Sequence, residues 1–210
     1  MVMWEVFTKL NPGEVVLVEY SSKVNPLPVF AEIIKWANAR GYQILITDLL
    51  NRLELCLRYM KIGKSECKAL EKAKVVEIGY REPPEVNVVK FINGDRELPA
   101  LLSEYKKVYE KLVSEKFTVA FLLGVERYVI LRRNDAIKLV SILGAFVGDT
   151  RRIAFYFVNK DILEGIIPNP LTMLEELATT IIELEKERGR IRLCITKALN
   201  PELDGQEIVI

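Results

Sequence analysis

The 210-residue chain contains no histidine, and this absence sets the first limit on its chemistry. Histidine is the usual side chain for proton transfer near neutral pH and the commonest metal ligand in proteins. Serine–histidine and cysteine–histidine hydrolases are therefore excluded. We predict no bound metal and no other cofactor, and the sequence assigns no catalytic residue.

An excess of charge of either sign is also missing. Thirty Lys and Arg residues stand against 29 Asp and Glu residues, which leaves a formal net charge of +1. Such a balance gives no general field that would gather polyanions. Basic pairs occur at Arg132-Arg133 and Arg151-Arg152, but acidic residues elsewhere on the chain dilute their field. Nucleic-acid binding is therefore not expected.

Long apolar runs and an export signal are absent as well. Residues 1–5 lack the basic start and the apolar stretch that a signal peptide needs. The longest apolar stretches, residues 117–125 and 139–148, are too short for the roughly 20 residues that cross a bilayer. We expect a cytoplasmic protein that makes no contact with a membrane.

Cysteine is scarce, and Cys56, Cys67 and Cys194 lack the paired spacing of a zinc or redox site. The apolar neighbours of Cys56 and Cys194 favour buried thiols. A Cys56–Cys67 disulfide is the alternative, because intracellular proteins of hyperthermophiles sometimes carry one. The composition fits such an origin, since the chain has only two glutamines and many Lys, Arg and Glu residues.

What the chain does contain is an alternation of apolar runs with helix-period stripes, in a length that one hydrophobic core can serve. Continuous apolar runs are typical of strands buried on both faces of a parallel sheet. The pattern predicts strands at residues 15–18, 43–47, 74–78, 86–92, 117–123 and 153–158, and helices at 29–40, 49–62, 65–73, 97–114 and 134–147. From residue 177 onward it predicts antiparallel strands. We therefore expect a single α/β domain over residues 1–210.

Three stretches carry a resemblance to the core of the RecA-like ATPases of the RadA and KaiC kind. Residues 12–19 are similar to the Pro-Gly opening and first strand of that core, and residues 40–47 to its second strand. Residues 177–210 are similar to its closing strands, including Lys197 after the penultimate one. More narrowly, the whole chain resembles a small Thermococcales-type family of unknown function from hyperthermophilic archaea. The resemblance implies a three-layer RecA-like sandwich with a mostly parallel sheet and antiparallel C-terminal strands.

The Walker motifs of that family are absent from this chain. A phosphate-binding loop needs glycines and a lysine, yet residues 20–28 contain no glycine and two prolines that lack an amide hydrogen. The one Gly63-Lys64-Ser65 triplet follows a predicted helix and is read as a helix end before a Ser N-cap. The family's magnesium-linked aspartate would follow residues 121–123, where this chain has Gly124. We expect a degenerate RecA-like domain that is not a conventional ATPase.

Polar residues that follow the predicted strands are the candidates for ligand binding, because open α/β sheets bind ligands beyond the carboxyl ends of their strands. Thr47, Glu126, Arg127 and Lys160 are also in such positions, and the candidates chosen are Glu19, Ser21, Ser22, Lys23, Asp48 and Asn159. Asp48 lies near where the family often places a water-activating carboxylate, or else it caps the following helix. Lys23 is expected either to bind an anion or to be an ordinary solvated loop residue.

Two functions follow from this combination of an intact frame and missing motifs. The first is a non-hydrolytic interaction or regulatory module, whose partner is another protein or a second copy of the chain, as in a homodimer. The alternative is a divergent nucleotide- or small-ligand-binding protein or enzyme, with its site at the strand carboxyl ends.

Overall fold

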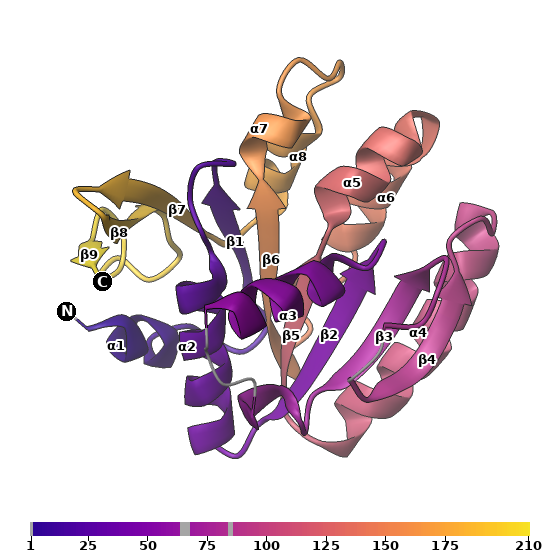
Figure 1. The fold of residues 1–210 in the computed structure, drawn as a ribbon, viewed down its shortest axis with the longest axis horizontal. Coiled ribbons are helices and arrows are strands. Elements are labelled where there is room, and N and C mark those ends of the chain that lie inside the picture. The colour runs from indigo at the N-terminus through magenta and orange to yellow at the C-terminus, as the bar shows by residue number, and fades with distance from the viewer. Residues whose placement is uncertain (1, 64–67, 84–85) are drawn as a thin grey trace.

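A computed structural model describes residues 2–63, 68–83 and 86–210, and these residues build one sheet of nine strands (Figure 1). The strand order is β4-β3-β2-β5-β6-β1-β7-β8-β9. The strands are β1 (Val15–Tyr20), β2 (Gln43–Leu49), β3 (Lys74–Gly79), β4 (Val88–Asn93), β5 (Thr118–Leu123), β6 (Arg152–Asn159), β7 (Thr180–Glu187), β8 (Arg190–Lys197) and β9 (Glu207–Val209). Neighbours from β4 to β7 are parallel, and β8 and β9 are added antiparallel. The predicted sheet class is confirmed.

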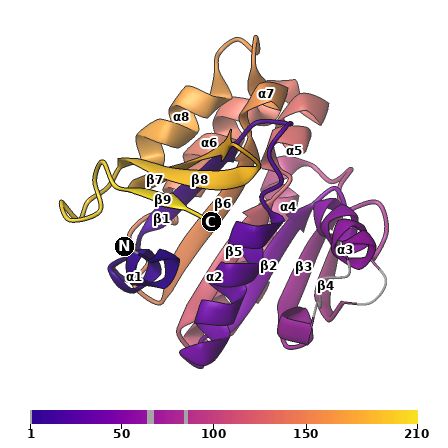
Figure 2. The ribbon, with the colours of Figure 1, turned by 60° about the vertical axis from the view of Figure 1, so that its left-hand side comes forward.

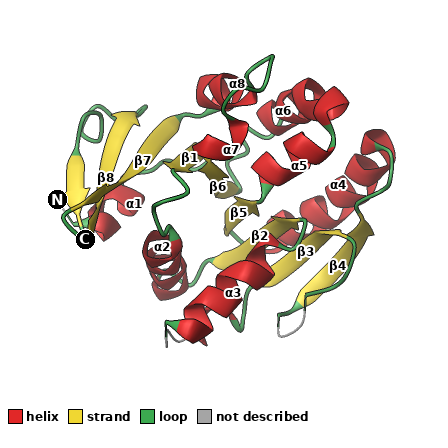
Figure 3. Ribbon diagram, turned by 45° about the horizontal axis from the view of Figure 1, so that its top comes forward, coloured by secondary structure: helices red, strands yellow, loops and turns green. Residues whose placement is uncertain are grey.

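Helices cover both faces of the sheet, so the molecule has three layers (Figure 3). Helices α1 to α3 lie on one face, and α4 to α8 lie on the other. They are α1 (Met3–Thr8), α2 (Leu27–Ala39), α3 (Arg52–Ile62), α4 (Leu98–Glu115), α5 (Val125–Leu131), α6 (Ala136–Gly144), α7 (Lys160–Leu163) and α8 (Pro170–Leu177), with 3-10 turns η1 (Lys68–Leu70) and η2 (Arg133–Asp135). Among the described residues, none of these helices combines the length and apolarity needed to span a membrane.

The two hydrophobic cores follow from the alternation of side chains along the central strands. In β1, Val16, Val18 and Tyr20 pack against the layer of α1 to α3. Val15 and Leu17 pack against the layer of α4 to α8. Since every residue of β1, β5 and β6 is buried, a ligand can approach this part of the sheet only at the ends of its strands.

The predicted strands and long helices are found, but several boundaries differ. The helix predicted from residue 49 begins at Arg52, because β2 runs on to Leu49 and the next two residues have positive φ, at 59° for Leu50 and 56° for Asn51. The helix predicted over residues 134–147 is divided into η2 and a shorter α6. Helices α1, α5, α7 and α8 were not predicted. The paired strands β3 and β4 run parallel, although only eight residues join them.

Three sequence hypotheses fall at least partly on residues 64–67, which lie outside the described residues. Of the helix predicted over residues 65–73, the described part forms only the 3-10 turn η1. Of the Gly63-Lys64-Ser65 triplet, only Gly63 is described, and it caps α3 as expected for a helix end. Of the hypothetical Cys56–Cys67 pair, only Cys56 is described, as a buried free thiol. Cys194 is also a free thiol, and it is only partly buried.

Candidate functional site

A cleft of about 340 Å³ lies at the carboxyl ends of β1, β5 and β6. It is bounded by the loop between β1 and α2, by α3 and by the first turn of α5. The lining residues are Tyr20, Ser22, Lys23, Val24, Asn25, Pro26, Leu27, Arg52, Leu55, Cys56, Tyr59, Glu126, Arg127, Asn159 and Ile162. Ligands of open α/β sheets bind at this edge.

The loop between β1 and α2 uses its own backbone amides. The Ser22 amide donates to Oδ2 of Asp161 in α7 at 2.8 Å, and the Val24 amide donates to the Ser21 carbonyl at 3.0 Å. The Lys23 amide lies 3.4 Å from Ser21 Oγ as a weaker donor. Prolines further along the loop have no amide hydrogen. These amides are therefore occupied by oxygen atoms of the chain itself and cannot form a phosphate cradle in this conformation.

The position that follows β5 has no room for a side chain. Gly124 has a φ of 81°, in the left-handed region that L residues avoid. A Cβ atom added there would lie well inside 3.0 Å of the Leu49 carbonyl oxygen. The backbone of β2 thus occupies the space that a carboxylate after β5 would need, which gives the missing magnesium-linked aspartate a steric reason.

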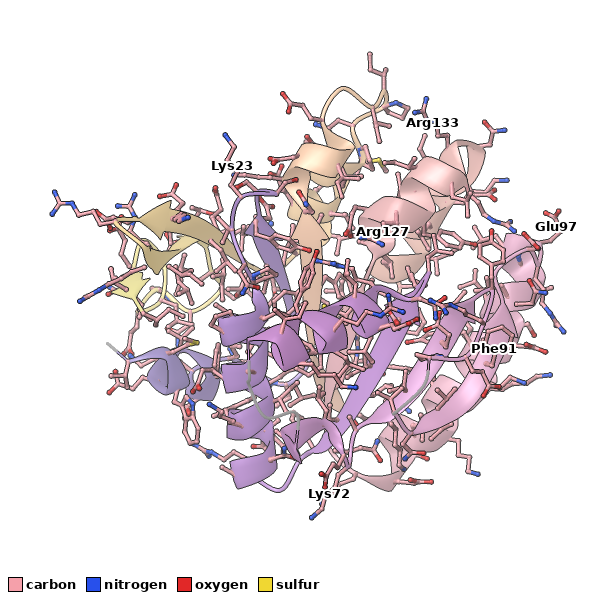
Figure 4. All side chains as sticks on the ribbon, viewed as in Figure 1. Lys23, Lys72, Phe91, Glu97, Arg127 and Arg133 are labelled. Carbon is pink, nitrogen blue, oxygen red and sulfur yellow. The ribbon has the colours of Figure 1, made fainter. Side chains whose placement is uncertain are left out.

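Three basic side chains line the cleft. Arg52, in the first turn of α3, is half-buried and donates from Nη2 to the Tyr20 hydroxyl at 3.3 Å. Arg127, in the first turn of α5, is half-buried. Its amide donates to the Gly124 carbonyl at 3.1 Å, and its guanidinium has no hydrogen bond or ion pair to any described residue. Lys23 is exposed, and Figure 4 shows it extending away from the sheet, whereas Arg127 lies between α5 and α3. The Arg127 guanidinium is therefore the donor best placed to meet an anion in the cleft.

Burial raises the pKa of two further groups in the cleft. Glu126 is only 1% exposed, and its Oε2 has no hydrogen-bond partner among the described residues. Burial raises the pKa of this carboxyl, although Arg52 and Arg127 act in the opposite direction. Burial also raises the pKa of the Cys56 thiol to about 11, so this thiol is not a reactive thiolate. The cleft accordingly offers binding groups and no activated nucleophile among its described residues.

Below the cleft, Asp48 and Glu77 form a buried carboxyl pair on the neighbouring strands β2 and β3. Both Asp48 oxygens accept the Leu53 amide at 3.0 Å, and Glu77 Oε1 accepts the Asn51 amide at 3.1 Å. The two residues are direct partners across the parallel strands, and Glu77 Oε2 has no hydrogen-bond partner among the described residues. Burial and the charge of Asp48 raise the pKa of Glu77 to about 9. This pair holds the strained corner at Leu50 before α3.

The structure brings together only part of the predicted site. Ser22, Lys23 and Asn159 line the cleft, and Asn159 Nδ2 donates to Ser22 Oγ at 3.0 Å. Ser21 does not line the cleft and instead accepts amides of its own loop. Asp48 is fully buried beneath the cleft, in a capping role toward α3.

Glu19 lies on the other face of the sheet, away from the cleft. It precedes Tyr20 in β1, so the two side chains point to opposite faces. Burial and the neighbouring Glu175 and Glu183 raise the pKa of Glu19 to about 7, while Lys160 lowers it. One carboxyl oxygen of Glu19 has no partner among the described residues.

Sequence reasoning missed the residues that α3 contributes to the cleft, namely Arg52, Cys56 and Tyr59, together with Tyr20. The candidates were sought only directly after each strand, whereas α3 forms a whole wall of the cleft. Helical spacing offered a signal, because positions 52, 56 and 59 are four and three residues apart and share one helix face.

Comparisons with known proteins agree with this architecture. Residues 5–209 match the model of a family described as Pyrococcus protein of unknown function, DUF257. The chain is 25% identical to PH0250 from Pyrococcus horikoshii OT3, with a TM-score of 0.80 over 99% of this chain and 98% of that one. It is 13% identical to the KaiC-like protein PH0186 from the same organism, with a TM-score of 0.63 over 94% and 85%. No curated protein matches the sequence. The predicted RecA/KaiC-like fold is confirmed.

Proposed function

The chain belongs to the DUF257 family of Pyrococcus proteins of unknown function, and from its own geometry we propose a RecA-like protein that does not hydrolyse ATP and acts as an interaction or regulatory module. One observation carries the first half of this proposal. The places where a RecA-like fold would hold phosphate and magnesium are filled by the chain's own atoms, by Asp161 against the Ser22 amide and by the Leu49 carbonyl against Gly124. Phosphoryl transfer depends almost wholly on positioning and charge stabilisation, and both are lost together.

We expect the purified protein to release no phosphate from ATP above the buffer blank, with magnesium and at elevated temperature. The wild type is assayed beside Lys23→Ala and Lys64→Ala, because either lysine could approach a phosphate from another direction. A contaminating ATPase would give the same rate in all three samples. Activity in the wild type that disappears in either variant would contradict the proposal.

The interaction role is supported by an exposed apolar groove beside the two chain ends. Figure 2 shows α1 close to β9 and the C-terminus. Exposed side chains of Val2, Trp4 and Ile210 line the groove, and Glu32 and Arg190 bring charges of both signs to it. A surface with both charges is complementary to its own copy across a two-fold axis. We therefore assign the groove to a second copy of the chain.

Light scattering after size-exclusion chromatography is expected to give a dimer, and Trp4→Glu is expected to give a monomer. The substitution places a charge in the apolar centre of the groove, next to Glu32, whose Oε2 accepts the Trp4 indole N–H at 3.1 Å. Leu199→Glu is the matched control, because Leu199 is an exposed apolar residue that does not line the groove. A wild type that stays monomeric at all concentrations would rule out this partner.

The unpartnered Arg127 favours a second candidate function, the binding of a small anion or nucleotide in the cleft. A thermal-shift screen of inorganic phosphate and adenine nucleotides tests it. A ligand at 100 times its dissociation constant stabilises the protein by about 2.7 kcal/mol. We expect Arg127→Ala to lose this response and the exposed Arg133→Ala to keep it (Figure 4). A screen without any shift would reject the candidate.

A further inference from the structure

A second cavity lies on the opposite side of the sheet from α3, under α4 and α6. It has a volume of about 60 Å³. Its walls are mainly aliphatic and aromatic side chains, with Leu101 from α4, Leu139 from α6 and Ala120 from β5 among them. Such walls favour an apolar molecule. The cavity shares no lining residue with the cleft.

One wall of this apolar cavity carries the guanidinium of Arg152. The residue is 3% exposed and lies at the start of β6. Its Nη2 donates to the Phe146 carbonyl at 2.9 Å, and its charge lies 5.7 Å from the ring centres of Tyr109 and Phe146. Its Nε has no partner, and no carboxylate of the described residues forms an ion pair with it. A buried charge without a counter-ion raises the free energy of the folded state, so an anion bound beside Arg152 would stabilise the protein.

Asp149 and Glu110 are paired with Arg151, the half-buried residue that precedes Arg152. Arg151 donates to Asp149 Oδ2 and to Glu110 Oε2, both at 2.7 Å. Asp149 also accepts the Tyr109 hydroxyl at 2.7 Å. These carboxylates are therefore engaged outside the cavity. Inside it, no carboxylate of the described residues pairs with the charge of Arg152.

A second unsatisfied donor lines the same cavity. Tyr128 is 2% exposed, and its hydroxyl has no hydrogen-bond partner among the described residues. The hydroxyls of Thr47, Tyr105 and Tyr109 also belong to the lining residues, but they are hydrogen-bonded within the chain. Two unsatisfied buried donors in these mainly apolar walls match a ligand that has one anionic end and an aliphatic remainder. On this measure one water fills about 10–15 Å³, so the chamber has room for about four to six non-hydrogen atoms.

We propose that this cavity binds a short-chain carboxylic acid of the size of propionate or butyrate. The carboxylate pairs with the Arg152 guanidinium, and the aliphatic chain lies against Leu101, Leu139 and Ala120. The pairing supplies the counter-ion that the fold does not provide, and a charge-assisted pair in such surroundings is strong.

The test is a calorimetric titration of the whole protein with propionate, with butyrate, and with butyramide as an uncharged ligand of the same size as butyrate. We expect saturable binding of butyrate and at least tenfold weaker binding of butyramide. Arg152→Met keeps an apolar side chain in place of the arginine and is expected to weaken butyrate binding about tenfold to a hundredfold. Arg151→Met is the matched control, and it is expected to bind butyrate as the wild type does.

Absence of saturable binding of both propionate and butyrate would overturn the proposal, and so would equal affinities for butyrate and butyramide. If Arg152→Met does not fold, Ala120→Val decides the matter. It narrows the cavity from β5 and leaves Arg152 in place, so butyrate binding should fall at least tenfold. Binding unchanged in Ala120→Val would place butyrate elsewhere and also overturn the proposal.

Discussion

Replacement of Gly124 by aspartate is expected to prevent stable folding, and Gly124→Ala is expected to lower the free energy of unfolding by about 2–5 kcal/mol. The φ of 81° already disfavours any L residue, and a Cβ atom would collide with the Leu49 carbonyl. Since Leu49 is the last residue of β2, relief requires a shift of a central strand. Denaturant unfolding followed by circular dichroism measures the loss.

Gly165→Ala is the matched control for this prediction. Gly165 has a similar φ of 74°, but a Cβ atom there would meet nothing within 4 Å. Gly165→Ala therefore measures the backbone strain alone, which is expected to lower the free energy of unfolding by about 1–2 kcal/mol. If Gly124→Ala lowers the free energy of unfolding by no more than Gly165→Ala does, the Leu49 carbonyl does not block a side chain at position 124. A carboxylate could then be accommodated after β5, which would contradict the prediction.

The wild type is expected to lose stability as the pH rises from about 5 to about 9. The folded-state pKa of Glu77, about 9, lies above the ordinary value of 4.5 for this side chain, so between these two pH values the folded protein holds a proton that the unfolded chain has lost. Stability from this group is complete below pH 4.5 and is lost as the pH rises toward 9. Each such proton changes the free energy of unfolding by up to about 1.4 kcal/mol per pH unit. Glu19, with a pKa of about 7, adds to the slope between pH 5 and 7 only.

Glu77→Gln is expected to remove most of the loss between pH 7 and 9. A glutamine amide keeps an oxygen for the Asn51 amide and stays uncharged beside Asp48 at every pH, as the protonated carboxyl is below its pKa. The variant should therefore match the wild type near pH 5 and exceed it by several kcal/mol at pH 9. Thermal unfolding across this range measures the difference. Glu115→Gln is the control, because Lys74 holds the pKa of that exposed carboxyl below its usual range. If the free energy of unfolding changes with pH equally in the wild type and in Glu77→Gln, Glu77 does not hold the extra proton and the prediction is wrong.

The strands could be predicted because a strand that is buried on both faces has a continuous apolar run in the sequence. β1, β5 and β6 each have such a run. Helix α5 has no such signal in the sequence, since it is only seven residues long and follows Gly124 without a capping side chain. The corner at Leu50 could not be foreseen either, because Glu77, a residue far along the chain, holds the neighbouring Asn51 amide.

The candidate site was foreseen at the level of its place in the fold and only in part at the level of residues. The rule about strand ends found Ser22, Lys23 and Asn159, and it also pointed to Glu126 and Arg127 after β5, which line the cleft but were not chosen as candidates. Strand alternation would have improved the list, because Glu19 and Tyr20 are neighbours and only one of them can face the cleft. The free guanidinium of Arg127 has no local signature, since its lack of a partner is a property of three-dimensional packing.

The place of β1 in the sheet has a consequence for the biosynthesis of the chain. Its two neighbours are β6 and β7, so Val16 pairs with Phe155 on one side and with Thr180 on the other. While the chain grows, the first strand to leave the ribosome has both edges unpaired, and unpaired edges invite association with other strands. Pairings so distant in sequence also slow folding. The first strand made is thus among the last to be enclosed.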